Sequence, residues 1–304
     1  MKQLSWQPIW GRFEIGKETI RFLGEEVEQP TGPAPGIGMI ISDCWFTGGT
    51  IEATVAFESG DETSCELVLY YDSDTKFMVT AGVGAPGLFN IRHWGQSGWV
   101  VHASAGDRRN LAPGSKYRLR ATLRGSSVAL SADGVLAVSA TLPFPLPQSQ
   151  VGVWCWGRKD IRFSRFAVQG TMPQAFIVMP FNGAFDDLDK QVIRKVCDKL
   201  KLDPVRADDV SGPGIVVADI AQKLRDAQVV IAEITESNCN VYYEIGYAHA
   251  LNKPTILLAQ QGVKPPFDVS PFRILYYQNT IGGKSKLEAS LRMNVEAALR
   301  ECGA

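Results

Sequence analysis

The stretch KYRLRATLRGSSVALSADGVLAVSA, residues 116–140, decides the fold class of the first half of the chain. Apolar and polar residues alternate in three short runs, which is the pattern of strands with one buried face. Asp133 and Gly134 form a dipeptide typical of a hairpin turn between the last two runs. The stretch therefore predicts consecutive short strands rather than helices.

Runs of the same kind surround this stretch on both sides. They are GGTIEATVAFESGD (48–61), CELVLYYDSD (65–74), KFMVTAG (76–82), QVGVWCW (150–156) and IRFSRFAVQG (161–170). We expect no amphipathic helix before about residue 185, so the first half is predicted to be an all-β sandwich. The order of these runs resembles the concanavalin A-like (LamG or glucanase-type) jelly roll over roughly residues 10–170. That resemblance implies sugar binders, glycoside hydrolases or interaction modules, so it does not specify a function.

The second half of the chain has a different pattern, in which strand-like and helix-like segments alternate. The expected strands are QAFIVMPF (174–181), LDPVRADD (202–209), AQVVIAEI (227–234), PTILLA (254–259) and FRILYYQ (272–278). The expected helices are 186–201, 212–227, 237–254 and 285–302. This alternation predicts a five-stranded parallel sheet of the flavodoxin-like α/β class. The predicted domains are residues 1–170 and 173–304.

Composition limits the classes of protein that the chain can belong to. The chain has 304 residues, 45% hydrophobic content and a net charge of −1. Such a balance favours neither nucleic acid nor a membrane as partner. The six cysteines form no C-x-x-C pair, which indicates free thiols in a reducing cytoplasm rather than a zinc site. We therefore expect a cytoplasmic protein without a resident metal.

The segment SNCNVYYEIGYAHALNKP, residues 237–254, contains the clearest candidate for a functional residue. Asparagine is a good helix N-cap, so a helix is expected to begin after Asn238 or Asn240. Glu244 then lies on or beside the apolar stripe of this helix, close to its start. A structural role, as a partner of the helix N-terminus, is the alternative to a catalytic role. Gly246 leaves room for a ligand to approach the helix.

The C-terminal half resembles the TIR-like and nucleoside 2-deoxyribosyltransferase-like superfamily over roughly residues 174–280. The resemblance rests on FIVMPFNGAFDDLDKQVI, VRADD and IAQKLRDAQVVIAEITESNCNVYYEIGYAHALNKPTILL. It implies that Glu244, in the Y-E-x-G segment, acts on the anomeric carbon of a nucleoside or nucleotide ribose. Two positions depart from the superfamily pattern: Glu233 replaces an aspartate, and Cys239 replaces a proline.

The leaving group decides which further residues such a reaction needs. Nicotinamide in NAD+ is already positively charged and leaves without protonation, whereas a neutral base needs an acid at its ring nitrogen. Candidates for this acid are Asp208, Asp209 and Glu233, and the predicted catalytic set is Glu244, Glu233 and Asp208. The predicted substrate-binding residues are Met179, Pro180, Phe181, Arg206, Asp209, Asn238, Asn240 and Tyr243. For Arg206 the alternative is a surface ion pair with Asp208 or Asp209.

Three functions remain open from the sequence. The resemblance implies an N-glycosidic bond hydrolase that cleaves NAD+ as its substrate, without a cofactor, as a homo-oligomeric effector of anti-phage defence. The second function is a nucleoside 2-deoxyribosyltransferase or deoxynucleotide N-hydrolase, and the third is a non-catalytic nucleotide-binding signalling module. The sandwich is expected to sense a ligand or to mediate assembly, with a sugar, a small molecule or a protein as activator. The cluster Arg92, His93, Trp94, Gln96 and Trp99 is its candidate binding surface.

Overall fold

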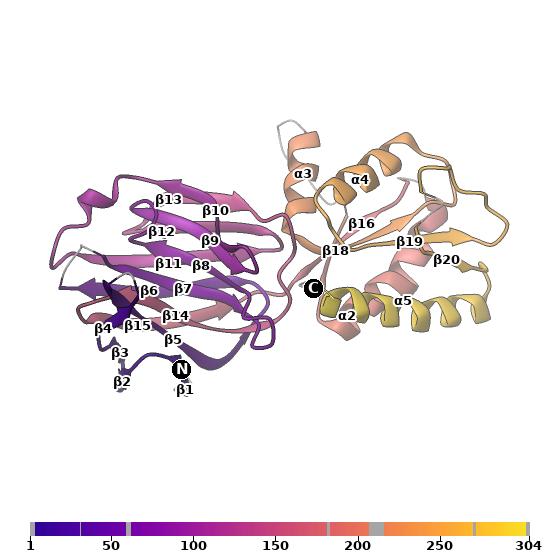
Figure 1. Ribbon diagram of the computed structural model, residues 1–304. Coiled ribbons are helices and arrows are strands. Elements are labelled where there is room, and N and C mark those ends of the chain that lie inside the picture. Colours follow the sequence, from indigo (N-terminus) through magenta and orange to yellow (C-terminus); the bar gives the residue numbers. More distant parts are fainter. Residues whose placement is uncertain are drawn as a thin grey trace. The chain divides into compact units, whose positions relative to one another are not determined.

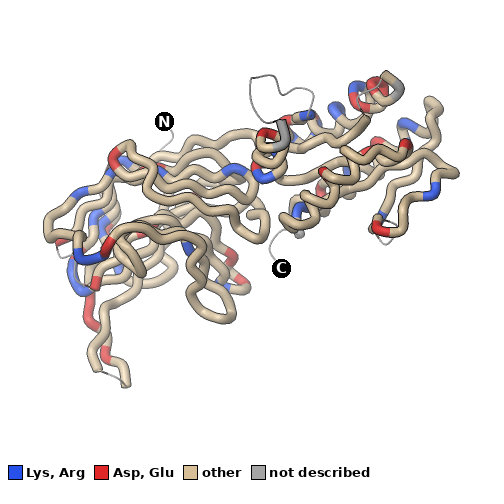
Figure 2. Tube along the Cα trace, turned by 90° about the horizontal axis from the view of Figure 1, so that it is seen from above, with Lys and Arg blue, Asp and Glu red and all other residues tan. Residues whose placement is uncertain are grey.

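The computed structural model describes residues 4–30, 32–58, 62–180, 183–206, 216–269 and 272–301. The chain forms two compact units, which Figure 1 shows in sequence colours. The first comprises Met1–Leu123, Ser127–Leu142 and Gln148–Thr171, and the second comprises Arg124–Ser126, Pro143–Pro147 and Met172–Ala304. Basic and acidic residues are interspersed along both units (Figure 2).

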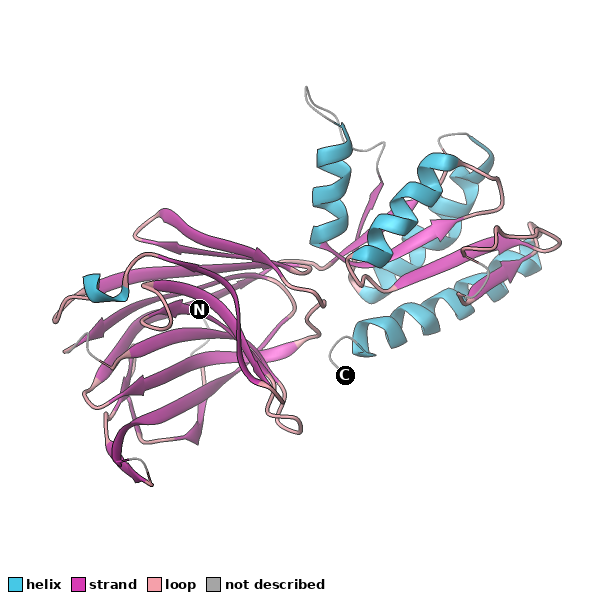
Figure 3. Cartoon of the chain, turned by 45° about the horizontal axis from the view of Figure 1, so that its top comes forward, coloured by secondary structure: helices cyan, strands magenta, loops and turns pink. Residues whose placement is uncertain are grey.

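The first unit consists of two antiparallel sheets (Figure 3). Its strands are β1 (Trp6–Trp10), β2 (Phe13–Ile15), β3 (Thr19–Phe22), β4 (Glu26–Gln29), β5 (Gly32–Phe46), β6 (Gly49–Phe57), β7 (Ser64–Tyr71), β8 (Met78–Val83), β9 (Phe89–Gly95), β10 (Gly98–Ala105), β11 (Lys116–Arg124), β12 (Ser127–Ala132), β13 (Val135–Thr141), β14 (Ser149–Gly157) and β15 (Ile161–Gly170), with the 3₁₀ turn η1 (Arg108–Asn110). One sheet has the order β1-β5-β14-β7-β8-β9-β10, with β4 paired to β5, and the other has the order β13-β12-β11-β6-β15-β3-β2. Several neighbouring strands, such as β5 and β14 or β6 and β15, are distant in sequence, so long connections cross between the two sheets.

Alternation of side chains builds the core of this sandwich. In β6 every second residue is buried, among them Ile51 and Val55 at 0% exposure. Leu119 in β11 is also fully buried, while its neighbours Arg118 and Arg120 pair with Glu52. One face of each strand therefore supplies the core, as expected for sheets packed face to face.

The stretch 116–140 has the structure that its alternation predicts. It forms β11, β12 and β13, and the hairpin turn falls at Asp133 and Gly134. Both turn residues have positive φ, 51° and 86°, as a two-residue type I′ turn requires. The predicted all-β sandwich is thus present in the first unit.

The second unit contains five strands and helices of unequal length. They are β16 (Gln174–Val178), η2 (Gly183–Phe185), α1 (Asp186–Leu188), the π turn η3 (Asp189–Ile193), α2 (Arg194–Leu200), β17 (Asp203–Arg206), α3 (Val216–Asp226), β18 (Ala227–Glu233), α4 (Cys239–Ala250), β19 (Thr255–Gln260), β20 (Ile274–Tyr277) and α5 (Ile281–Glu301). The strands pair in parallel in the order β17-β16-β18-β19-β20. All five strands therefore direct their carboxyl ends to one edge of the sheet.

Two buried clusters cover the two faces of this small sheet. Ala175 and Ile177 of β16 pack in one cluster with residues of α2 and α5, such as Leu291. Phe176 and Val178, which alternate with them, pack in the other cluster with residues of α3 and α4. The side-chain period of two in a strand explains why neighbouring residues enter opposite clusters.

The fold class expected from the sequence needs correction. The structure is mostly β, with 49% strand and 22% helix, and its C-terminal part is not a clear flavodoxin-like (TIR-like) sheet. Helical spacing of Leu188, Val192, Val196 and Leu200 predicted one regular helix after β16. The chain is helical from Asp186 to Leu200 without a gap, but residues Asp189–Ile193 form a π turn between α1 and α2, so the helix is present and is not regular. The outer strands β17 and β20 have four residues each.

The cysteines agree with the sequence analysis. Cys44, Cys65, Cys155, Cys197 and Cys239 are free thiols, and Cys302 lies outside the described residues. Among the described helices, none is long and apolar enough to cross a membrane.

Candidate functional site

Helix α4 has a well-defined start, which fixes the position of its side chains. The Oδ1 atom of Asn238 accepts hydrogen bonds from the backbone N–H groups of Asn240 (2.9 Å) and Val241 (3.3 Å). Asn238 is therefore the N-cap, and this half of the sequence expectation is confirmed. The side chain of Asn240 is exposed, next to the cap.

Glu244 is a buried acid in the second turn of α4. Its residue is 6% exposed, and Val241, Ile245 and Ala248 on the same helix are also buried. Among the described residues its carboxyl group has no hydrogen-bond partner and no ion pair. Burial raises the pKa of Glu244 from 4.5 to about 7. The expected alternative, in which Glu244 caps its own helix, is not what the structure shows, because Asn238 caps the helix.

Open space lies at Gly246, on the exposed side of α4 that faces away from Glu244. A Cβ atom added to Gly246 would meet no atom within 4 Å. The residue is exposed, and its φ is not in the left-handed region, so the backbone does not require glycine. The absence of a side chain thus leaves this part of the helix surface uncovered.

Glu233 is a second buried acid on the segment that leads into α4. It ends β18 and is 0% exposed. Its Oε1 atom accepts a hydrogen bond from the backbone N–H of Thr235 (2.8 Å), whereas its buried Oε2 atom has no hydrogen-bond partner in the described part of the chain. Burial raises the pKa of Glu233 to about 7, although hydrogen bonds from Thr235 and Tyr277 act in the opposite direction. No hydrogen bond joins Glu233 to Glu244 among those that the structure describes.

Three adjacent strands bring polar residues together around Glu233. Glu233, Gln260 and Tyr277 are the last residues of β18, β19 and β20, respectively. Thr235 connects them, since its Oγ1 atom accepts a hydrogen bond from the backbone N–H of Gln260 (2.8 Å). Burial and the proximity of Glu233 raise the pKa of Tyr277. Sequence reasoning missed Tyr277 and Gln260, although their positions at the ends of parallel strands were a signal.

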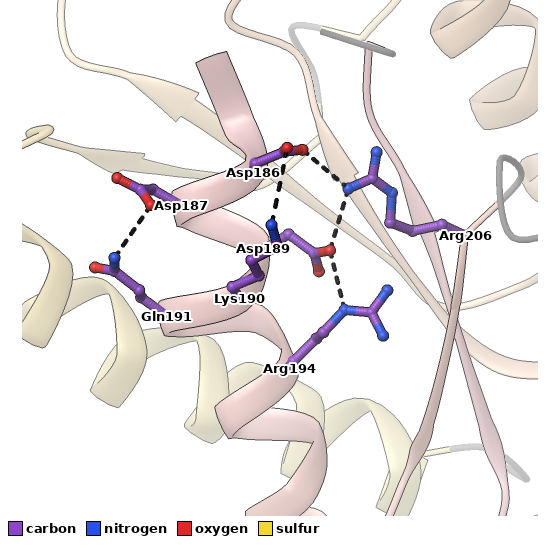
Figure 4. A network of polar contacts seen from close by, with 7 residues as sticks. All are labelled: Asp186, Asp187, Asp189, Lys190, Gln191, Arg194 and Arg206. Atoms are coloured by element: carbon purple, nitrogen blue, oxygen red, sulfur yellow. Dashed lines mark hydrogen bonds and ion pairs between the residues drawn. The ribbon is translucent and has the colours of Figure 1, made fainter. Parts of the chain in front are cut away.

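Arg206 belongs to a buried charge network at the end of β17 (Figure 4). Its Nη1 atom lies 3.1 Å from Oδ2 of Asp189 and 3.5 Å from Oδ1 of Asp186. Nε of Arg194 lies 3.0 Å from the same Oδ2 atom. The alternative expected from the sequence, an ion pair of Arg206 with Asp208 or Asp209, lies outside the described residues, whereas the ion pair with Asp189 was not foreseen.

The π turn η3 places Asp189 at the centre of this network. Asp189 is 1% exposed, and its Oδ1 atom is buried without a hydrogen-bond partner in the described part of the chain. The flanking acid Asp187 points elsewhere and accepts a hydrogen bond from Gln191 (Figure 4). Turns of the π type are frequent at functional sites because they displace one side chain from the helical register.

The remaining predicted site residues fall into three groups. Met179 is 4% exposed and packs in a core cluster, and Pro180 is buried as well. Tyr243 is 58% exposed on α4. Phe181, Asp208 and Asp209 lie outside the described residues. Within the described ranges no three His, Cys, Asp or Glu residues gather in a way that could hold a metal ion.

Two residues of the candidate binding surface of the sandwich, Arg92 and His93, make contacts with neighbouring side chains of the sheet. Nε of Arg92 donates a hydrogen bond to Oε2 of Glu66 (3.1 Å), and both side chains are buried. The guanidinium also lies 3.7 Å from the ring centre of Trp99. His93 contacts His102, with Nδ1 and Nε2 2.7 Å apart. These contacts show that Arg92 and His93 stabilise the sheet.

Comparisons with known proteins concern only the fold of the sandwich. No protein-family model and no curated protein matches the chain. The carbohydrate-binding module CBM66 from Bacillus subtilis is 17% identical, with a TM-score of 0.44, over 53% of this chain and 92% of that one. Bacillus licheniformis β-glucanase is 12% identical, with a TM-score of 0.37, over 56% and 94%. A Bacillus subtilis protein with a galectin-like fold is 12% identical, with a TM-score of 0.38, over 53% and 87%.

Likeness at this level carries no argument about activity. None of the three is a TIR-like protein or a deoxyribosyltransferase, so that resemblance rests on the sequence alone.

Proposed function

We propose that the second unit hydrolyses the N-glycosidic bond of a nucleotide, with NAD+ as the preferred substrate and Glu244 as the carboxylate that faces the ribose. The observation that carries the proposal is the buried carboxyl group of Glu244, which has no partner in the described part of the chain. The similarity of the Y-E-x-G segment to the TIR-like and nucleoside 2-deoxyribosyltransferase-like superfamily supports it. We also propose that the protein acts as a homo-oligomeric effector of anti-phage defence.

The energetic cost of the site supports a role in catalysis. Glu244 is a buried residue, so its carboxyl group has lost much of its hydration, which disfavours the charged form. Such costs are common at functional sites, where a perturbed pKa serves the chemistry. Glu244, with a pKa of about 7, changes charge near neutral pH and so responds to a charged substrate.

The reaction with NAD+ needs few protein groups. The bond between the ribose anomeric carbon and the nicotinamide nitrogen breaks, and its electron pair stays on the nitrogen, which becomes neutral. The ribose becomes an oxocarbenium-like cation that the Glu244 carboxylate stabilises. Water then attacks this carbon and loses a proton, which gives ADP-ribose and nicotinamide. A nearby cation also lowers the pKa of Glu244 and favours its ionised form.

The test is incubation of the full chain with NAD+ and measurement of nicotinamide and ADP-ribose by mass spectrometry. We expect product with the wild type and a loss of at least about 100-fold in Glu244→Gln, which keeps the size of the side chain and removes its charge. Glu296→Gln, an acid of α5 that pairs with Arg292 across one helical turn, serves as the control and keeps the activity. Full activity in Glu244→Gln contradicts the assignment.

A second candidate function is cleavage of a nucleoside or deoxynucleotide with a neutral base. The buried Oε2 atom of Glu233 without a described partner favours it, because a carboxyl group with a pKa of about 7 can donate a proton at neutral pH. This function needs Glu233 as well as Glu244. Incubation with a panel of deoxynucleosides, with and without an acceptor base, tests this function. Glu233→Gln should abolish the cleavage of deoxynucleosides and leave the cleavage of NAD+ unchanged.

A further inference from the structure

The sandwich contains a cavity that belongs to neither of the sites described above. It has a volume of about 470 Å³ and lies where β1 and the ends of β5, β7 and β14 meet. The neighbouring cluster of Arg92, Glu66 and Trp99 does not line it. All residues that line this cavity belong to the first unit.

A bulge in β5 creates the space. Ile41 pairs with Gly152 and Trp45 pairs with Gln150, so β5 advances by four residues where β14 advances by two. The extra residues include Asp43, whose Oδ1 atom accepts a hydrogen bond from the backbone N–H of Ser5 (3.0 Å). Bulges of this kind redirect side chains at the ends of sheets.

Aromatic side chains form part of the wall. Trp45 is 62% exposed, although indole is among the largest apolar side chains. Trp6 and Tyr71 also line the cavity, and both are partly exposed. Flat aromatic faces next to water suit a ligand that has an apolar face and polar edges.

Polar groups complete the wall, and their charge selects the ligand. Asp43 and Asp72 contribute carboxylates, and Gln148 and Gln150 contribute amides. Hydrogen bonds from Thr75 and Asp74 lower the pKa of Asp72, so its carboxylate stays ionised at neutral pH. The described residues that line the cavity include no Lys, Arg or His. An anionic ligand such as a phosphate or a nucleotide is therefore repelled.

We propose that this cavity binds a neutral saccharide of one or two rings, with one ring stacked on Trp45 and its hydroxyl groups hydrogen-bonded to the carboxylates and amides. The fixed carboxylates of Asp43 and Asp72 accept hydrogen bonds from hydroxyl groups, and the amides of Gln148 and Gln150 both donate and accept. A simple cation would use the carboxylates and leave both amides without a role. The size suits one or two sugar rings, since small-ligand pockets start at about 300 Å³.

The test is saturation-transfer NMR of the full chain with glucose, galactose, mannose, fructose, sucrose, maltose, cellobiose and lactose, followed by calorimetry. We expect at least one neutral sugar to bind, and we expect Trp45→Ala to weaken it by about tenfold. Gln148→Ala, at an exposed position, weakens the same sugar without a risk to folding. Val135→Ala is the control, because Val135 is an exposed apolar residue of β13 that does not line the cavity and belongs to neither candidate site.

Three outcomes overturn the proposal. They are the absence of binding by every sugar of the panel, equal binding by the wild type and by both variants of the cavity, and preferential binding of glucose 6-phosphate or choline over the neutral sugars. None of them depends on the activity of the second unit, so this proposal and the N-glycosidase proposal fail separately.

Discussion

Arg206 and Asp189 form an ion pair across the end of β17 and the π turn η3, with Nη1 and Oδ2 3.1 Å apart and both side chains buried. Arg194 contacts the same oxygen atom of Asp189. One carboxylate thus holds two guanidinium groups, and one of them is almost inaccessible to water. Such an arrangement is sensitive to the loss of its shared partner.

We predict that Asp189→Asn destabilises the second unit by about 3 kcal/mol, because Arg206 and Arg194 then lose the negative charge of the buried carboxylate that they share. Urea unfolding, followed by circular dichroism, measures the change. Asp187→Asn is the control, since that side chain is 72% exposed, and it should change stability by less than about 0.5 kcal/mol. Equal effects of the two substitutions would show that the buried ion pair contributes no more to the free energy of unfolding than an exposed side chain does.

The raised pKa of Glu244 predicts how stability depends on pH. The folded protein binds this proton more tightly than the unfolded chain, so the contribution of Glu244 to stability is complete below about pH 4.5 and is lost as the pH rises through about 7. The displacement of the pKa from 4.5 to about 7 corresponds to roughly 3 kcal/mol. Glu244→Gln should therefore raise the melting temperature at pH 8 and leave it nearly unchanged at pH 4.5. A gain of the same size at both pH values contradicts the burial of this carboxyl group.

The pH dependence of activity should separate the two proposed reactions. NAD+ cleavage uses ionised Glu244, so kcat/KM should rise about tenfold per pH unit below about pH 7 and become constant above it. Cleavage of a neutral base also needs a protonated acid, so its kcat/KM should fall above about pH 7, where Glu233 loses its proton. Initial rates between pH 5 and 9 measure both profiles. A flat profile for every substrate would remove both glutamates from the mechanism.

Gly246 offers a test of stability on the exposed side of α4, away from Glu244. Gly246→Ala should stabilise the protein by about 1 kcal/mol, because alanine favours a helix interior and its methyl group meets no atom. Since residues two apart on a helix do not face each other, KM and kcat for NAD+ should stay unchanged. Thermal unfolding and steady-state kinetics of the same sample give these quantities. A raised KM would show that the substrate reaches the face of α4 opposite Glu244.

Local features of the fold could be predicted from the sequence. Asp133 and Gly134 both have positive φ, a property that their residue types favour without help from distant parts of the chain. Asn238 caps α4 through its own neighbours, so the start of this helix was also readable. Alternation in residues 116–140 likewise needs only the period of a strand.

Features that depend on distant residues could not be predicted. The partner of Arg206 is 17 positions away, in a π turn that keeps ordinary helical spacing in the sequence. Tyr277 comes near Glu233 only because β18, β19 and β20 are neighbours in the sheet. The π turn between α1 and α2 is also invisible to periodicity, because the residues around it keep helical spacing in the sequence.

The cap at Asn238 also sets the angular phase of α4. Successive residues of an α-helix are rotated by about 100°, and the count begins where the cap fixes the first turn. One residue inserted between Asn238 and Glu244 would turn the carboxyl group out of the core and bring a different side chain into its place. The loop asparagine therefore acts as a reference point for the glutamate two turns away, without any contact between them.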